Sequence, residues 1–121
     1  EPVFVHANPQ VRADNAKAAV VKGPLVYCME EIDNGENLSS IMVNVNQNIE
    51  ETYDNELLEG CSVLHITGKK ISDKGWDEET LYQNRKIELE DIKLTLVPYC
   101  YWGNRKNGEM LVWMKELFQV E

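Results

Sequence analysis

Thiol and imidazole groups are the side chains of this sequence that could carry metal or nucleophilic chemistry. They are Cys28, Cys61, Cys100, His6 and His65. No two of them show the Cys-x₂₋₄-Cys or His-x₃₋₅-His spacing of a structural zinc site. His65 has the strand parity opposite to Leu64 and Ile66, so we expect it to face solvent rather than a cysteine nucleophile. We therefore predict no metal site and no Cys–His catalytic pair, and we interpret Cys28 and Cys100 as small core residues on facing strands.

Paired carboxylates could serve a glycosidase, which needs two of them about 5–10 Å apart in a cleft. The acidic runs are Glu30-Glu31, Glu50-Glu51, Asp77-Glu78-Glu79 and Glu90-Asp91. Neighbours on a strand point to opposite faces, so adjacency argues against a shared site. Solvated surface charge is the favoured interpretation, and we predict no catalytic residue in this chain.

The segment "PYCYWGNRKNGEMLVWM" (98–114) holds the remaining candidates for chemistry. Its parity places Cys100 and Trp102 with the core and turns the tyrosines outward. An outward aromatic face can stack on a sugar, with amide and guanidinium groups bonding the hydroxyls, or can lie in a protein interface. Packing or interface use is favoured over sugar stacking. The candidate interface or sugar-contact residues are Tyr99, Tyr101, Asn104, Arg105 and Trp113.

Length and charge limit the partners. The chain has 121 residues, 43% of them hydrophobic, which suits one folded domain over residues 1–121. Its formal net charge of −9 argues against nucleic acid and anionic membranes as partners. No apolar run is long enough for a membrane helix. Three widely spaced cysteines favour reduced thiols in the cytoplasm, with one disulfide plus one thiol left open. Because the first residues already resemble a strand, we expect a piece of a longer protein.

The apolar pattern is that of β-strands throughout. Alternation over 41–46 is typical of a half-buried strand, another strand is expected to end at Gly68, and Gly23-Pro24 and residues 33–35 are turn signals. Residues 69–86 are predicted to be a long surface loop or a crossover, and to be mobile. The parity of apolar residues changes at Glu90-Asp91, which predicts a bulge or turn.

Asn107-Gly108 predicts a tight hairpin, with 109–118 as the partner strand of the preceding segment. A helix over 110–118 is the weaker alternative. About eight short strands and no long helix predict an antiparallel β-sandwich of jelly-roll type.

Three runs, 25–29, 96–102 and 111–114, are apolar on both strand parities. A sandwich strand needs only one apolar face, so their outer face is expected to be covered by a neighbouring domain or subunit. The alternative is that a loop or the tail of the same chain packs over them.

Three segments resemble the C-terminal end of glycoside hydrolase family 127, the β-L-arabinofuranosidase family. They are "ANPQVRADNAKAAV" (7–20), "KGPLVYCMEEIDN" (22–34) and "PYCYWGNRKNGEMLVWM" (98–114). Members typically show R-G-P-L-V-Y-C-L-E, then P-Y-Y-x-W-x-N-R and G-x-M-x-V-W. The likeness runs nearly end to end and is weakest over 47–86. This sequence departs from it at Lys22, where arginine is usual, and at Cys100, where an aromatic residue is usual.

The resemblance implies a division of labour within a longer protein. In that family an N-terminal (α/α)₆ barrel holds the cysteine nucleophile, its acidic partners and the zinc-ligating cysteines, and β-sandwich domains follow. None of the three cysteines here matches a catalytic or zinc position, so no cofactor is expected in this chain. The last sandwich helps to form a homodimer in a characterised type of member.

We therefore expect a non-catalytic accessory domain of a glycoside hydrolase that acts on L-arabinofuranosides. Its expected partners are the catalytic barrel of the same polypeptide and a possible second copy. The alternative is a carbohydrate-binding module that holds plant-type oligosaccharides through its outward tyrosines.

Overall fold

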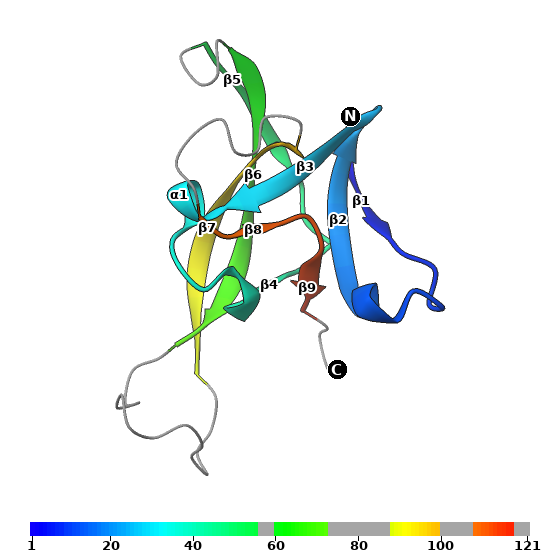
Figure 1. The fold of residues 1–121 in the computed structure, drawn as a ribbon. Helices are drawn as coiled ribbons and strands as arrows, with labels where there is room; N and C mark the ends of the chain where they lie inside the picture. Colours follow the sequence, from blue (N-terminus) through cyan, green and yellow to red (C-terminus); the bar gives the residue numbers. More distant parts are fainter. Residues whose placement is uncertain (56–59, 73–87, 100–107, 118–121) are drawn as a thin grey trace.

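The structure, a computed structural model, describes residues 1–55, 60–72, 88–99 and 108–117 (Figure 1). Within these residues the strands are β1 (Pro2–His6), β2 (Lys17–Lys22), β3 (Leu25–Glu30), β4 (Ile41–Val43), β5 (Glu50–Asp54), β6 (Cys61–Ile71), β7 (Leu89–Pro98), β8 (Met110–Leu111) and β9 (Met114–Glu116). Three short helical turns join them: η1 (Arg12–Asp14), α1 (Glu31–Asn34) and η2 (Leu38–Ser40). The predicted all-β class is confirmed.

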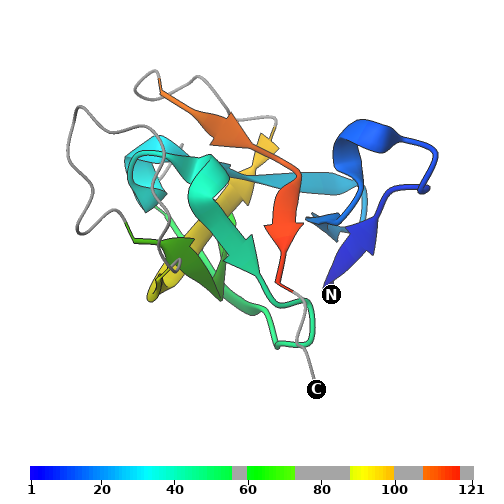
Figure 2. The same cartoon turned by 90° about the horizontal axis from the view of Figure 1, so that it is seen from below.

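The strands form one sheet that closes on itself. They pair in the order β1-β2-β9-β4-β6-β7-β3-β8, β5 pairs with β6, and β2 also pairs with β3. The path from β2 through β9, β4, β6, β7 and β3 therefore returns to β2. Figure 2 shows β1 at the outer side of this arrangement, away from β6 and β7.

One pair breaks the predicted antiparallel pattern. β9 is antiparallel to β2 but parallel to β4. Because β2 and β4 run in opposite directions, a strand between them must be parallel to one of the two. The sheet is mixed at this pair, and the jelly-roll order is not confirmed by these pairings.

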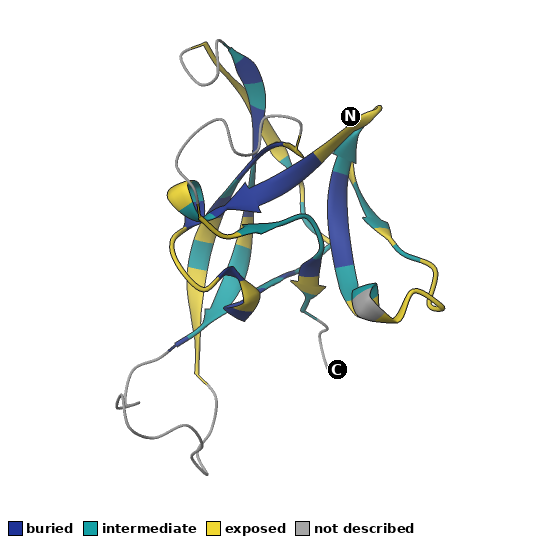
Figure 3. Cartoon of the chain, viewed as in Figure 1, coloured by how far each residue is buried: buried dark blue, intermediate teal, exposed yellow. Residues whose placement is uncertain are grey.

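The main core lies where the inner faces of the strands meet, and Figure 3 shows their central parts as buried. Ile41 and Val43 are 1% and 0% exposed, as the alternation of that strand predicted. Phe4 of β1 packs against the core from the side. The core residues are Val20, Tyr27, Met29, Leu38, Ile41, Val43, Leu64, Ile66, Leu94, Leu96 and Met114. Each such side chain contributes roughly 1.5–3 kcal/mol by leaving water.

A second apolar cluster lies on the opposite face of β3, β6 and β7. Cys28, Cys61, Val63 and Val97 are buried there, with Met110 and Val112 packed against them. Strands β3 and β7 are thus apolar on both parities because another part of the same chain covers their outer face. At these positions the cover that we expected from a neighbouring domain or subunit is supplied by the segment around β8. Residues 100–102 of the same predicted run lie outside the described residues.

Two side-chain amides extend the sheet where its strands stop. Pairing of β3 with β7 reaches Met29↔Leu96, and the buried Asn34 continues it at Thr95. Its Nδ2 donates to the Thr95 carbonyl (2.9 Å) and its Oδ1 accepts from the Thr95 amide (2.8 Å). Gln47 does the same at Thr67, with a donor distance of 2.8 Å and an acceptor distance of 2.9 Å.

Gln47 fills a defined gap along β6. Strand β4 pairs with β6 as far as Val43↔Gly68, and β5 resumes the pairing at Glu50↔His65. Without the amide of Gln47, the backbone of Thr67 would lose its partner between these two strands. The two amides therefore act as substitutes for strand residues.

The predicted hairpin is wrong. Strand β8 pairs with β3 rather than with β7, through Met29↔Leu111 and Glu30↔Met110. β3 therefore separates β7 from β8. The Asn-Gly signal is local, whereas the long-range packing of β3 decides which strand β8 meets. The alternative helix over 110–118 is also wrong, because β8 and β9 occupy 110–111 and 114–116.

Two further predictions along β6 and β7 need correction. Strand β6 continues beyond Gly68 to Ile71, so residues 69–71 are not part of the predicted surface loop; residues 73–87 lie outside the described residues. No bulge occurs at Glu90-Asp91, because β6 and β7 stay in register from Leu64↔Leu96 to Ile71↔Leu89. The apolar pattern changes parity at this point because Leu89 does not face the core: it is 43% exposed.

Candidate binding surfaces

The predicted aromatic site is only partly within the described residues. Tyr99 follows β7 and is 45% exposed, which confirms that it faces outward. Trp113 is half-buried between β8 and β9. Tyr101, Asn104 and Arg105 lie outside the described residues. Because β3 separates β7 from β8, the two described aromatic residues do not come from adjacent strands.

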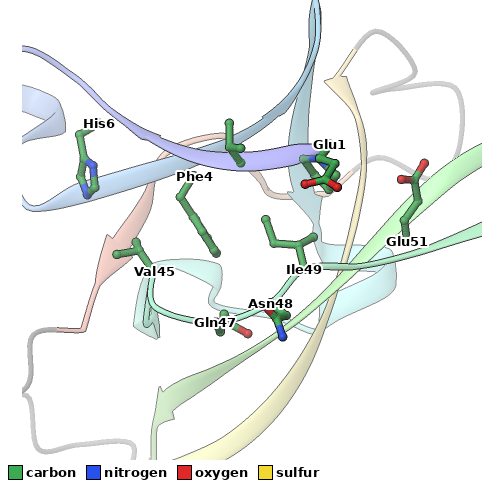
Figure 4. Close-up of a pocket in the computed structure, with 10 residues that line it drawn as sticks. Glu1, Phe4, His6, Val45, Gln47, Asn48, Ile49 and Glu51 are labelled. Atoms are coloured by element: carbon green, nitrogen blue, oxygen red, sulfur yellow. The ribbon is translucent and has the colours of Figure 1, made fainter.

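A groove of about 640 Å³ runs beneath β1 (Figure 4). Phe4 points down from β1 between Val45 and Ile49, which gives the groove an apolar floor. His6 lies at one end, and Glu1 and Glu51 lie at the other. Sugar-binding sites also combine an aromatic ring with polar groups. Whether this groove could bind a sugar therefore depends on whether its polar groups are available for hydrogen bonds.

Most of the polar groups around this groove are already engaged. His6 Nε2 lies 2.7 Å from Glu116 Oε1, which links β1 to β9. The Gln47 amide is bonded to the Thr67 backbone, and the Lys22 ammonium donates to Glu51. A ligand rich in hydroxyls would compete with these contacts for the same polar groups.

Glu51 is unsuited to act as a general acid. Hydrogen bonds from the Lys22 ammonium and then from the Ser62 hydroxyl hold the pKa of the Glu51 carboxyl below its usual value. A general acid needs a raised pKa so that it carries a proton at neutral pH. Its ion pair with Lys22 connects the end of β2 to β5.

A second groove, of about 470 Å³, lies over β5, β6 and β7. His65 is half-exposed there, as its parity predicted, and its Nε2 lies 3.0 Å from the Thr52 hydroxyl. Glu50 and Thr95 are its cross-strand neighbours. The His65 imidazole therefore contacts the Thr52 hydroxyl. The groove is lined in part by polar side chains of these strands.

Within residues 1–55, 60–72, 88–99 and 108–117, no three His, Cys, Asp or Glu side chains gather as metal ligands would. Nor does any helix among the same residues have the length and apolar character to cross a membrane. Cys28 and Cys61 are buried in one cluster, and Cys100 lies outside the described residues.

Sequence reasoning missed two side-chain contacts between distant residues, the hydrogen bond of His6 with Glu116 and the ion pair of Lys22 with Glu51. These contacts join residues 110 and 29 positions apart, respectively. No spacing rule applies at such separations, and only the closed sheet brings these residues together.

The comparisons with known proteins identify the family. The model of the glycoside hydrolase family 127 C-terminal domain matches residues 2–115. The chain belongs to this family. A curated relative, the non-reducing end β-L-arabinofuranosidase of Bifidobacterium longum subsp. longum, is 33% identical over 118 residues, which is 93% of this chain and 18% of the relative.

Solved structures agree with this assignment. A family 127 β-L-arabinofuranosidase from Geobacillus stearothermophilus T6 is 34% identical, with a TM-score of 0.91 over 97% of this chain and 18% of that one. A family 127 β-arabinofuranosidase is 36% identical, with a TM-score of 0.82 over 96% of this chain and 17% of that one. A further glycoside hydrolase is 29% identical, with a TM-score of 0.80 over 96% and 19%. The chain thus spans less than a fifth of these relatives.

Proposed function

We propose that this chain is a non-catalytic accessory domain of a glycoside hydrolase that acts on L-arabinofuranosides. The observation that carries the proposal is the match to the C-terminal domain of a hydrolase family together with coverage of only 18% of the curated relative. The domain would support the catalytic barrel that the resemblance implies, and no cofactor is assigned to it. Its location would be cytoplasmic, which its few, widely spaced cysteines support.

An interface, between domains or with a second copy, is part of the proposal. Tyr99, with 45% of its surface exposed, and the half-buried Trp113 are its described candidates. Tyr101, Asn104 and Arg105 complete the predicted set. Tyrosine and tryptophan suit such surfaces because they combine a large apolar body with one polar group.

An activity assay tests the catalytic half of the proposal. The isolated chain, shown to be folded by circular dichroism, is incubated with a chromogenic β-L-arabinofuranoside, with and without added Zn²⁺. We expect no release of the chromophore, while the full-length polypeptide that carries this chain releases it. Hydrolysis by the isolated chain at a rate near that of the full-length polypeptide would refute the proposal.

A carbohydrate-binding module is the second candidate, favoured by the exposed ring of Tyr99. Tryptophan fluorescence during titration with arabinan-type oligosaccharides separates the two functions. The accessory domain predicts no saturable change. A saturable change that Tyr99→Ala removes would support the binding module instead.

A further inference from the structure

Three valines form an exposed row across the first three strands. Val3 of β1 is the cross-strand partner of Val21 of β2, and Val21 is also the partner of Val26 of β3. Cross-strand partners project from the same face of a sheet, so the three side chains lie side by side. We call them the valine row.

The valine row lies on the outer face of the sheet. The neighbouring residues Phe4, Val20 and Tyr27 belong to or pack against the main core, so the valines project away from it. Val3 is 50% exposed and Val26 is 38% exposed, whereas Val21 between them is half-buried. Single exposed apolar residues are ordinary, but a contiguous row on a chain with a net charge of −9 is a candidate contact surface.

The same face of β3 is covered further along the strand. Cys28, two residues after Val26, is 1% exposed because Met110 and Val112 pack near it. Val26 has the same parity and lacks this cover. The row is therefore the open continuation of an apolar face that the chain elsewhere covers by itself.

We propose that the valine row packs against the polypeptide that precedes this chain in the longer protein. This inference rests on the proposed function as a C-terminal accessory domain. The relatives described above have more than four-fifths of their length outside the matched part, and a C-terminal domain is preceded by the rest of its polypeptide. Val3 lies in β1, the first strand of the part that the family model matches from residue 2 onward, so the row lies at the end of the domain that a preceding polypeptide enters.

The size of the row favours a covalently attached partner over a second copy. A stable interface between separate molecules buries about 800 Å² on each partner, which three valines cannot supply. A tethered partner is present at an effective concentration in the millimolar range, so a small apolar contact is sufficient to hold it.

The test compares two protein lengths. The double variant Val3→Thr/Val26→Thr keeps side chains that are β-branched and of similar size but makes the row polar. Val11→Thr is the matched control: Val11 is 47% exposed and precedes η1, at the opposite end of β2 from the row. Each variant is made in the isolated chain and in the full-length polypeptide, and thermal unfolding and limited proteolysis are measured.

We expect the double variant to unfold at the same temperature as the parent when isolated. In the full-length polypeptide it should speed proteolytic release of this domain several-fold, whereas Val11→Thr changes neither measurement. Equal release by the double variant and the control would overturn the inference. An isolated chain that dimerises, and becomes monomeric in the double variant by light scattering, would also overturn it, by assigning the row to a second copy. The activity assay on the isolated chain is independent of all these outcomes, so failure of the inference and failure of the proposed function are distinguishable.

Discussion

At the scale of single residues, an ion pair connects two strands that are not hydrogen-bonded neighbours in the sheet. Lys22 and Glu51 join β2 to β5 with side chains that are 33% and 31% exposed. Such half-exposed pairs stabilise a protein little by Coulomb energy, because water screens them. Their pH dependence is nonetheless measurable, because the pKa of Glu51 is lowered in the fold.

Glu51→Gln should remove a pH-dependent part of the stability. A carboxyl with a lowered folded pKa contributes stability above its unfolded pKa, about 4.3, and that contribution is lost as the pH falls through the folded value. The variant should therefore be less stable than the parent at pH 7, and the difference should vanish towards pH 3. Urea unfolding across this range measures it.

The control for this prediction is Glu50→Gln, one residue earlier on the opposite face of β5. Its unfolding curves should stay close to those of the parent at every pH. A difference between Glu51→Gln and the parent that is constant from pH 7 to pH 3 would contradict the assignment of the ion pair.

Which individual residues are buried was largely predictable from parity. His65 faces outward and Ile41 and Val43 face the core, as their alternation indicated. Parity does not predict burial where both faces of a strand are covered, as at Cys28. Alternation identifies the face that meets the core, but it does not show which segment packs on the other face. Of the candidate site, the outward position of Tyr99 was predictable, whereas the partners of His6 and Glu51 were not.

At the scale of elements, two side-chain amides form hydrogen bonds with backbone groups of β6 and β7 that have no partner from a neighbouring strand. Asn34 is 6% exposed and also donates from Nδ2 to the Glu30 carbonyl at 2.9 Å. Gln47 is more exposed, and it also donates to the Asn44 carbonyl at 2.7 Å. Loss of a donor should cost more at the buried position, since water cannot replace it there.

Asn34→Asp should lower the free energy of unfolding by about 2–4 kcal/mol, because an oxygen replaces the donor facing two carbonyls in a buried site. The matched change Gln47→Glu should cost about 1 kcal/mol, since water reaches that site. Urea unfolding at pH 7 measures both. Equal losses for the two variants would show that burial does not distinguish the two amides.

The positions of the strands in the sequence were predicted better than the strands with which they pair. Alternation located β4 and β6, and the Gly23-Pro24 signal located the turn between β2 and β3, where Gly23 has φ +57°. The partner of each strand depends on packing between distant segments, so the local Asn-Gly signal assigned β8 to the wrong neighbour. For the same reason no local pattern indicated the parallel pair of β4 and β9.

At the scale of the whole molecule, the chain has 21 acidic residues and only 12 basic ones. Excess charge of one sign destabilises a compact chain through self-repulsion. Salt shortens the range of that repulsion from about 30 Å at 10 mM to about 8 Å at 150 mM.

We therefore expect the urea midpoint of the chain to rise between 10 and 150 mM NaCl. The variant Glu88→Gln/Glu90→Gln, which removes two acids from exposed positions just before and within β7, should show a shallower rise. A midpoint that falls with salt would show that attractive ion pairs outweigh the net repulsion.

The place of β9 has a consequence for how the chain folds as it is made. Residues 114–116 lie between β2 and β4 and join the β1–β2 part of the sheet to the β4–β6–β7 part. The partners of β9, Lys17 and Ala18 on one side and Met42 and Val43 on the other, are synthesised far earlier. The sheet therefore cannot close while residues 114–116 are still inside the ribosome tunnel, and during that interval the edges of β2 and β4 that later meet β9 stay unpaired and open to contact with other chains.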